Sequence, residues 1–204
     1  MSWIYGVFAY PDGDATAMHD DLFEAVRESP DLTERISERR ITTAADEDIS
    51  FGVYAPTLDS NVSITPENVP CIVLRRSKGG VFYDESEGRD AYVDLLVTIY
   101  EHLPSRPALG YGLDVNQAAC IFDEDEVGPL VGERPHEFTD SAWVMFVTPD
   151  LVDEYGKETL FDLPARRVEE LDDGTVLVVA PGDPADYTEH WDIGEELGLP
   201  GPLG

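Results

Sequence analysis

Short runs of apolar, β-branched and aromatic residues, interrupted by glycine and proline, predict several β-strands. The first strand covers residues 3–10 (WIYGVFAY) and ends at the turn sequence Pro11-Asp12-Gly13. Residues 168–171 and 176–179 are expected to pair across Asp172-Asp173-Gly174, because Asp-Gly favours tight hairpin turns. Further strands are predicted at residues 49–55, 62–64, 71–74, 81–83 and 141–147.

Apolar positions at helical spacing predict the helices. The clearest helix covers residues 86–103, where five apolar residues repeat at intervals of three and four before Pro104 ends the pattern. A helix is also expected to begin after Asp14 or Thr16 and to end at Ser29-Pro30. Asp31 and Glu34 resemble a capping box and predict a short helix over residues 31–40. Two more short helices are predicted at residues 149–155 and 189–197.

These predicted strands outnumber the helices and mostly follow one another in the sequence. This order favours an α+β fold with mixed, largely antiparallel sheets packed against one long helix and two or three short helices. Residues 108–140 contain many glycines and prolines and are expected to form long loops. We predict a single domain over residues 1–197, or two intertwined halves at residues 1–84 and 85–197, followed by a flexible tail at residues 198–204.

The charge balance adds a strong constraint on the environment of this fold. The chain has 43 acidic and 13 basic residues, a net charge of −30, and only two lysines, Lys78 and Lys157. Hydrophobic residues make up 42% of the chain, which is enough for a folded core, so the acids are expected at the surface. The composition resembles that of cytosolic proteins from salt-accumulating haloarchaea. It predicts a protein that needs bulk salt cations and loosens when salt is withdrawn.

The same charge excludes two classes of partner. A strongly acidic surface repels both nucleic acid and anionic lipid, so neither is expected to bind. Residues 1–10 lack the basic start of a signal peptide, and no apolar run reaches the roughly 20 residues of a membrane span. A cytoplasmic location is therefore expected. Cys71 and Cys120 lie in apolar runs and are predicted to be buried thiols, with a disulfide as the alternative.

Candidate catalytic and cofactor residues are few. The four histidines lack metal-binding spacing, and the glycines form neither a dinucleotide fingerprint nor a P-loop, so no metal and no cofactor are predicted. The run Asp123-Glu124-Asp125-Glu126 lacks the pattern of an EF-hand and is interpreted as hydrated surface. His102 is assigned a structural role at the C-terminal end of the long helix, and His190 a role either in packing or in a surface contact. His136 remains as a weak catalytic candidate because it lies in an irregular segment.

The clearest positive segment contains Arg75, Arg76 and Lys78. One interpretation is a hairpin turn between residues 71–74 and 81–83, and the other is a site for an anion or a partner, because arginine grips oxyanions with two hydrogen bonds. A second basic cluster, Arg35, Arg39 and Arg40, is interleaved with glutamates and is interpreted as an ion-paired helical surface. Arg166 and Arg167 either protect a sheet edge or contact a partner.

These observations favour a non-catalytic binding or protein-interaction module of a halophilic cytosol, with an unknown protein or a small anion as its partner. The alternative is a small hydrolase or transferase acting on an anionic substrate. In that enzyme His136 or a buried cysteine would do the chemistry, with His136 as the acid or base and Arg75 and Arg76 as the substrate clamp. A third alternative is self-association into a homo-oligomer.

Overall fold

Within the residues that the structure describes, the chain folds around an antiparallel sheet of nine strands. A computed structural model describes residues 3–10, 17, 20–22, 24–25, 35–37, 40–42, 48–54, 71–77, 86–114, 137–138, 140–182, 184 and 190–199. Across the sheet the strand order is β2-β3-β4-β5-β1-β6-β7-β9-β8. The strands are β1 (Trp3–Ala9), β2 (Arg35–Ser37), β3 (Arg40–Thr42), β4 (Asp48–Tyr54), β5 (Cys71–Ser77), β6 (Leu109–Asp114), β7 (Val144–Val147), β8 (Arg167–Glu170) and β9 (Val176–Val179).

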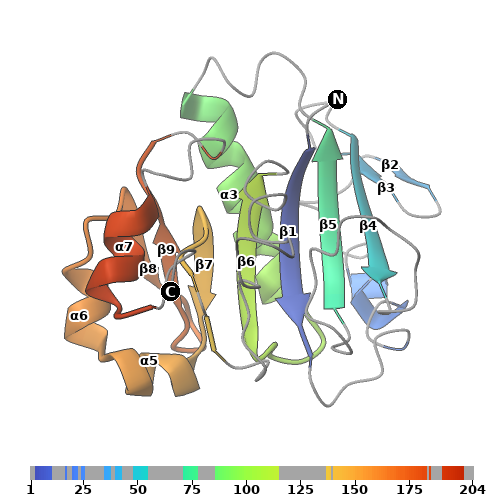
Figure 1. Cartoon of the computed structure of the whole chain (residues 1–204). Helices are drawn as coiled ribbons and strands as arrows, with labels where there is room; N and C mark the ends of the chain where they lie inside the picture. The colour runs from blue at the N-terminus through green and yellow to red at the C-terminus, as the bar shows by residue number, and fades with distance from the viewer. Residues whose placement is uncertain are drawn as a thin grey trace, which may run out of the picture.

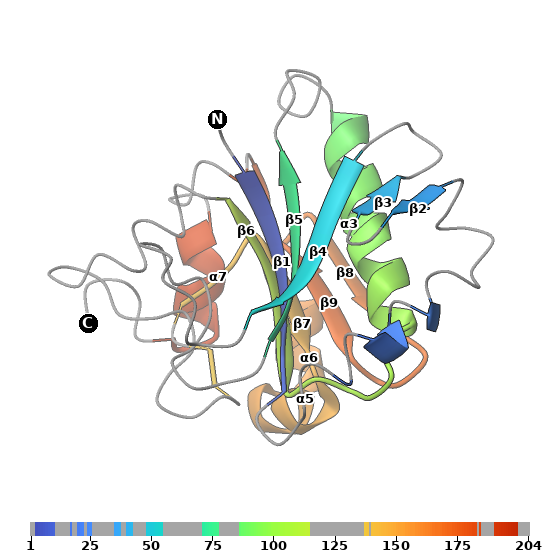
Figure 2. The same cartoon turned by 90° about the vertical axis from the view of Figure 1, so that its right-hand side faces the viewer.

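Helices lie on both faces of this sheet. Helix α3 (Ser86–Glu101) lies behind the strands in Figure 1 and to one side of them in Figure 2. Helix α7 (Trp191–Glu196) lies on the opposite face. Helices α5 (Pro149–Tyr155) and α6 (Lys157–Phe161) lie beside the β7–β9–β8 end of the sheet. No helix within the described part of the chain is long and apolar enough to cross a membrane.

Close packing of α3 requires glycines in the central strands. A Cβ atom added at Gly6 of β1 would collide with Cδ2 of Leu96, and one at Gly112 of β6 would lie 3.2 Å from Cδ1 of the same leucine. At Gly110 an added Cβ would lie 2.6 Å from the ring of Phe8. These glycines therefore leave room for a helix side chain and an aromatic ring at the middle of the sheet.

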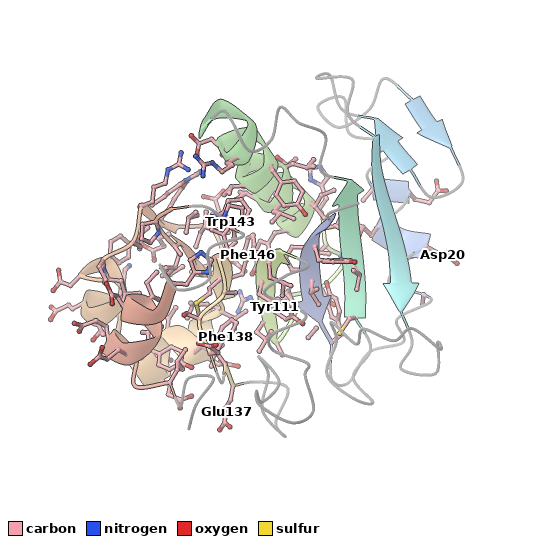
Figure 3. The ribbon with its side chains drawn as sticks, turned by 45° about the horizontal axis from the view of Figure 1, so that its top comes forward. Asp20, Tyr111, Glu137, Phe138, Trp143 and Phe146 are labelled. Carbon is pink, nitrogen blue, oxygen red and sulfur yellow. The ribbon has the colours of Figure 1, made fainter. Side chains whose placement is uncertain are left out.

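The core between α3 and the sheet is rich in aromatic rings. Tyr92 of α3 stacks on Trp143 with ring centroids 6.3 Å apart, and Tyr100 stacks on Phe146 at 5.0 Å. Phe8 meets Phe146 edge to face at 5.3 Å. Figure 3 shows Trp143 and Phe146 inside the molecule, among the strands next to α3. The apolar positions predicted at helical spacing therefore supply one side of this core: Tyr92, Leu95, Leu96, Ile99 and, partly buried, Leu103.

The α+β class expected from the sequence agrees with the antiparallel sheet and its helices. The predicted hairpin is confirmed, since β8 pairs with β9 and Gly174 has the positive φ of 86° that its turn requires. Described residues 17, 20–22, 24 and 25 are helical, as expected for the segment after Thr16.

The helix predicted over residues 31–40 is wrong. Residues 35–37 and 40–42 form the paired strands β2 and β3, with Ile36 opposite Ile41 and Ile41 opposite Ile49. Isoleucine side chains favour strands, and this cross-strand row outweighs the capping signal that favoured a helix. The proposed ion-paired helical surface of Arg35 and Arg40 is wrong with it.

Two strands begin or end at residues that differ from the predicted ones. The segment of long loops predicted from residue 108 begins instead with β6, which lies beside β1 near the middle of the sheet. Gly110 and Gly112 lowered its strand propensity but are required by the packing described above. Strand β5 runs to Ser77, three residues beyond its predicted end. The predicted strands at residues 62–64 and 81–83 lie outside the described residues.

Candidate functional site

The predicted anion-binding residues do not share one turn. Arg75 and Arg76 lie within β5, so a hairpin turn at these two residues is wrong. Arg75 lies opposite Tyr5 on one side and Ser50 on the other, whereas Arg76 lies opposite Ile4 and Ile49. Successive strand positions alternate between the two faces of a sheet, which places positions 75 and 76 on opposite faces. Lys78 and His136 lie outside the described residues.

The cysteine that could act as a nucleophile is in an unsuitable environment. Cys71 begins β5 and is fully buried, in agreement with the predicted buried thiol. Burial raises the pKa of this thiol to about 12 because the thiolate would lose its solvation. At neutral pH the group therefore stays protonated and is a poor nucleophile. Cys120 lies outside the described residues.

Three buried polar residues meet where β7 begins and α7 starts. The Ser141 hydroxyl donates a hydrogen bond of 2.7 Å to the backbone carbonyl of His190, and the Ser141 amide donates one of 2.7 Å to Asp140 Oδ1. Ser141 and His190 are buried, and Asp140 is 8% exposed. Although serine, histidine and aspartate are the residue types of a hydrolytic triad, this serine donates to a peptide carbonyl, as a structural link does. The link holds α7 against β7.

Asp140 gives this link a pH dependence. Burial is the largest influence on the Asp140 pKa and raises it above 3.8, although hydrogen bonds from Ser141 act in the opposite direction. The folded protein is therefore destabilised at neutral pH by a buried carboxylate, and this penalty shrinks once the pH falls below the raised pKa and is lost as the pH passes the ordinary value of 3.8.

We expect Asp140→Asn to raise the urea midpoint at neutral pH, since the amide oxygen can still accept from Ser141. The difference from the wild type should shrink as the pH approaches 3.8, which denaturation at several pH values measures. Asp153→Asn is the matched control, because Asp153 is an exposed carboxylate on α5 and its loss changes the net charge equally. Equal effects of the two substitutions would show that burial of Asp140 plays no part.

A second polar cluster ties the end of α3 to the β8–β9 turn. The Tyr100 hydroxyl lies 2.8 Å from Asp173 Oδ2, to which it donates, and 2.6 Å from Thr175 Oγ1. Arg106 completes the cluster by donating to the same carboxylate oxygen and to the Asp173 carbonyl. Burial opposes ionisation of Asp173, but the hydrogen bonds and Arg106 together lower its pKa, so it remains a carboxylate. The cluster positions the hairpin turn.

Strand β8 forms one edge of the sheet and carries charged residues on both faces. Arg167 binds Asp94 of α3 and Glu169 of its own strand at 2.6 Å, which indicates that these charges face α3. Glu170 is the next strand position after Glu169 and therefore lies on the other face of the sheet, where Lys157 of α6 forms an ion pair with it at 2.6 Å. Arg166 contacts Asp90 of α3. Charged side chains on both faces hinder pairing with another chain, so edge protection is the better explanation of Arg166 and Arg167.

The remaining histidine predictions agree with the structure where it can be compared. His102 follows the last turn of α3, and its Nδ1 lies 2.7 Å from the Thr98 carbonyl, as expected for a structural group at a helix end. His190 is buried, which agrees with the predicted packing role and not with the alternative of a surface contact. Within the described residues no three histidine, cysteine or acidic side chains are placed to hold a metal. Asp123-Glu124-Asp125-Glu126 lies outside the described residues.

Sequence reasoning missed both polar clusters because their members are far apart in the chain. Asp173 was recognised only as part of a turn, and Ser141 only as the start of an apolar strand. A weak signal was present, since the hydroxyl group of a tyrosine on the buried stripe of a helix needs a polar partner inside the protein.

Comparison with models of known protein families gives no match for this chain, and comparison with curated proteins gives none either.

Proposed function

We propose that the chain is a single α+β domain, its sheet packed against one long helix and a few short ones, that acts as a non-catalytic binding module in a salt-rich cytosol. The basic segment of Arg75, Arg76 and Lys78 is the proposed place where an anion or a partner group binds, and since Arg75 and Arg76 lie on opposite faces of the sheet, one such group would contact only one of these two arginines. The observation that carries this proposal is the burial of the potentially reactive side chains among the described residues. Cys71, Ser141 and His190 are all buried within the fold.

The described charges add support. Every arginine and lysine whose side chain the structure describes donates a hydrogen bond within the protein, and four of the five bind a carboxylate. The five are Arg89, Arg106, Lys157, Arg166 and Arg167. Because these cations are already used internally, an anion or an acidic partner group is expected to bind through the basic residues nearer the β2–β5 end of the sheet.

The alternative function is a small hydrolase or transferase that acts on an anionic substrate. It requires His136 to act as acid or base and Arg75 with Arg76 to hold an anionic substrate. Positions 75 and 76 lie on opposite faces of the sheet, so one substrate group could not be held by both as successive strand residues. The buried Cys71 thiol, with its raised pKa, weakens the version of this alternative that uses a cysteine.

Co-expression with the products of neighbouring genes tests the proposal. We expect one of them to co-elute with this chain at a fixed ratio in concentrated KCl, while an unrelated acidic protein of similar size does not. In parallel, the purified chain is assayed for hydrolysis of p-nitrophenyl acetate and p-nitrophenyl phosphate. Turnover that disappears in a folded His136→Ala variant would favour the hydrolase and contradict the binding module.

A further inference from the structure

Two distant segments of the chain bring arginines to one row of the sheet. Arg40 of β3 lies opposite Ser50 of β4, and Ser50 lies opposite Arg75 of β5. Residues directly opposite one another in antiparallel strands share a face of the sheet. Two strand spacings, about 10 Å, therefore separate the Arg40 and Arg75 backbone positions. The register therefore places two arginine positions on one face of the sheet with a single strand between them.

A third arginine position lies next to this row. Ser37 of β2 lies opposite Arg40, and Arg35 is two residues before Ser37 on the same strand and hence on the same face. Such a diagonal neighbour lies roughly 7–8 Å from Arg40. Three of the 13 basic residues of the chain thus occupy one corner of the sheet. We call Arg35, Arg40 and Arg75 the arginine corner.

The arginine corner is on the face of the sheet away from α3. Tyr5 lies opposite Arg75, and its neighbour Gly6 is the position that Leu96 of α3 covers. Because neighbouring strand positions alternate, the row of Tyr5 and Arg75 faces away from that helix. Figure 1 views the sheet from this side, with α3 behind β1 and β6. Arg76 belongs to the opposite face.

Small hydroxyl residues share the rows of the arginine corner. By strand register the paired positions of β2 to β5 on this face include Ser37, Thr42, Ser50 and Ser77, and among them one acidic residue, Asp48. Within these paired positions three arginines occur with one acidic residue, the reverse of the whole chain, in which acids outnumber bases by 43 to 13. Hydroxyl groups can donate further hydrogen bonds to an oxyanion.

We propose that the arginine corner binds a phosphate group. Phosphate presents three or four oxygens in different directions, so it can accept from guanidinium groups on three sides, whereas a carboxylate has only two oxygens. Arginine keeps its charge and its paired donors even where salt screens longer-range attraction. The inference rests on the proposed binding function and names its ligand, and it replaces the Arg75–Arg76 pair with residues from three strands.

Calorimetric titration with inorganic phosphate, pyrophosphate and glycerol 3-phosphate tests this site, the last distinguishing an esterified from a free phosphate. Titrations are done in KCl of about 1 M, where the screening length is about 3 Å and non-specific attraction is suppressed. We expect at least one of these compounds to bind, and Arg40→Ala and Arg75→Ala each to weaken its affinity about tenfold or more. Arg75→Lys should lose part of the affinity, because it keeps the charge but not the paired donors.

Two variants complete the design. Arg167→Ala is the charge-matched control, because Arg167 is bound to Asp94 and Glu169 at the far edge of the sheet, and it should bind as the wild type does. Arg76→Ala distinguishes binding by the arginine corner from binding by the Arg75–Arg76 pair. Arg76 is next to Arg75 in the sequence but lies on the other face of the sheet. Near-UV circular dichroism identifies variants that do not fold, and a lysine substitution at the same position then replaces them.

The inference is overturned if Arg76→Ala weakens binding as much as Arg75→Ala, because the adjacent pair would then form the site. It is also overturned if the wild type binds none of the three compounds. The second result leaves the proposed binding function intact, because co-elution with a partner protein is measured independently.

Discussion

Transfer of the purified protein from concentrated KCl into dilute buffer is expected to unfold it. The net charge of −30 is spread over an accessible surface of 10444 Å², or one uncompensated charge per roughly 350 Å², about 19 Å apart. Each neighbouring pair then repels by about 0.2 kcal/mol in unscreened water. With about six neighbours for each charge and each pair counted once, there are about 90 such pairs, and their repulsion sums to on the order of 20 kcal/mol. Unfolding relieves a large part of this repulsion because the expanded chain holds its charges farther apart, and that relief is comparable with the roughly 5–15 kcal/mol that holds a typical domain folded.

Salt also weakens the attractive ion pairs of the protein. The net effect of salt on stability depends on whether this loss is smaller than the repulsion that salt removes. The pairs on α3, β8 and the neighbouring loops are exposed and contribute about 0–1 kcal/mol each, so their weakening in salt is small. At about 1 M the screening length of about 3 Å is far shorter than the charge separation, which removes most of the repulsion.

Far-UV and near-UV circular dichroism during a KCl titration measure this transition. NaCl at equal ionic strength should protect the fold similarly, since the effect is screening, whereas an equally concentrated neutral sugar should protect it less. A melting temperature that does not change between concentrated KCl and dilute buffer would refute the salt dependence and, with it, the inferred habitat.

Replacement of Gly110 by alanine is expected to destabilise the middle of the sheet strongly, because the added methyl group would meet an aromatic ring and not the flexible end of a side chain. The new Cβ would lie 2.6 and 2.9 Å from two ring carbons of Phe8 and 3.2 Å from Cβ of Phe146. Phe8 is fully buried and packs against Phe146 and Tyr100, so its ring cannot move without disturbing two other rings. We expect a loss of about 1–3 kcal/mol, or roughly 2–12 °C in melting temperature.

A double-mutant cycle provides the control. In a Phe8→Leu background the side chain opposite Gly110 is smaller and more flexible, so Gly110→Ala should cost at least about 1 kcal/mol less than in the wild type. Chemical denaturation in a fixed concentration of KCl measures all four proteins. If the two substitutions are additive, the ring of Phe8 is not what excludes a side chain at position 110.

The sequence predicted elements well where the local signal and the packing agree. The hairpin around Gly174 was found because its turn needs a residue at positive φ, and the buried stripe of α3 was found from its spacing. Strand β6 and strands β2 and β3 were missed for opposite reasons. In β6, glycines imposed by Leu96 and Phe8 weakened a strand signal, while in β2 and β3 a helix-like cap concealed isoleucines whose partners lie on other strands.

The candidate site shows the same limit. Arg75 and Arg76 are neighbours in the chain, and only the extension of β5 to Ser77 places them on opposite faces. Arg40 was expected on a helix, far from both. No local pattern links Arg40 to Arg75, because the link is the register of β4 between them.

The amino-acid sequence alone determined the acidity of this protein, its capacity for a core and its α+β class, because composition and short-range periodicity are properties of the chain itself. Only the tertiary structure decided which basic residues share a face, which polar residues hold the core together and why glycines lie at the centre of the sheet. Those features depend on strand register and on the close approach of α3, and both arise from contacts between residues far apart in the chain.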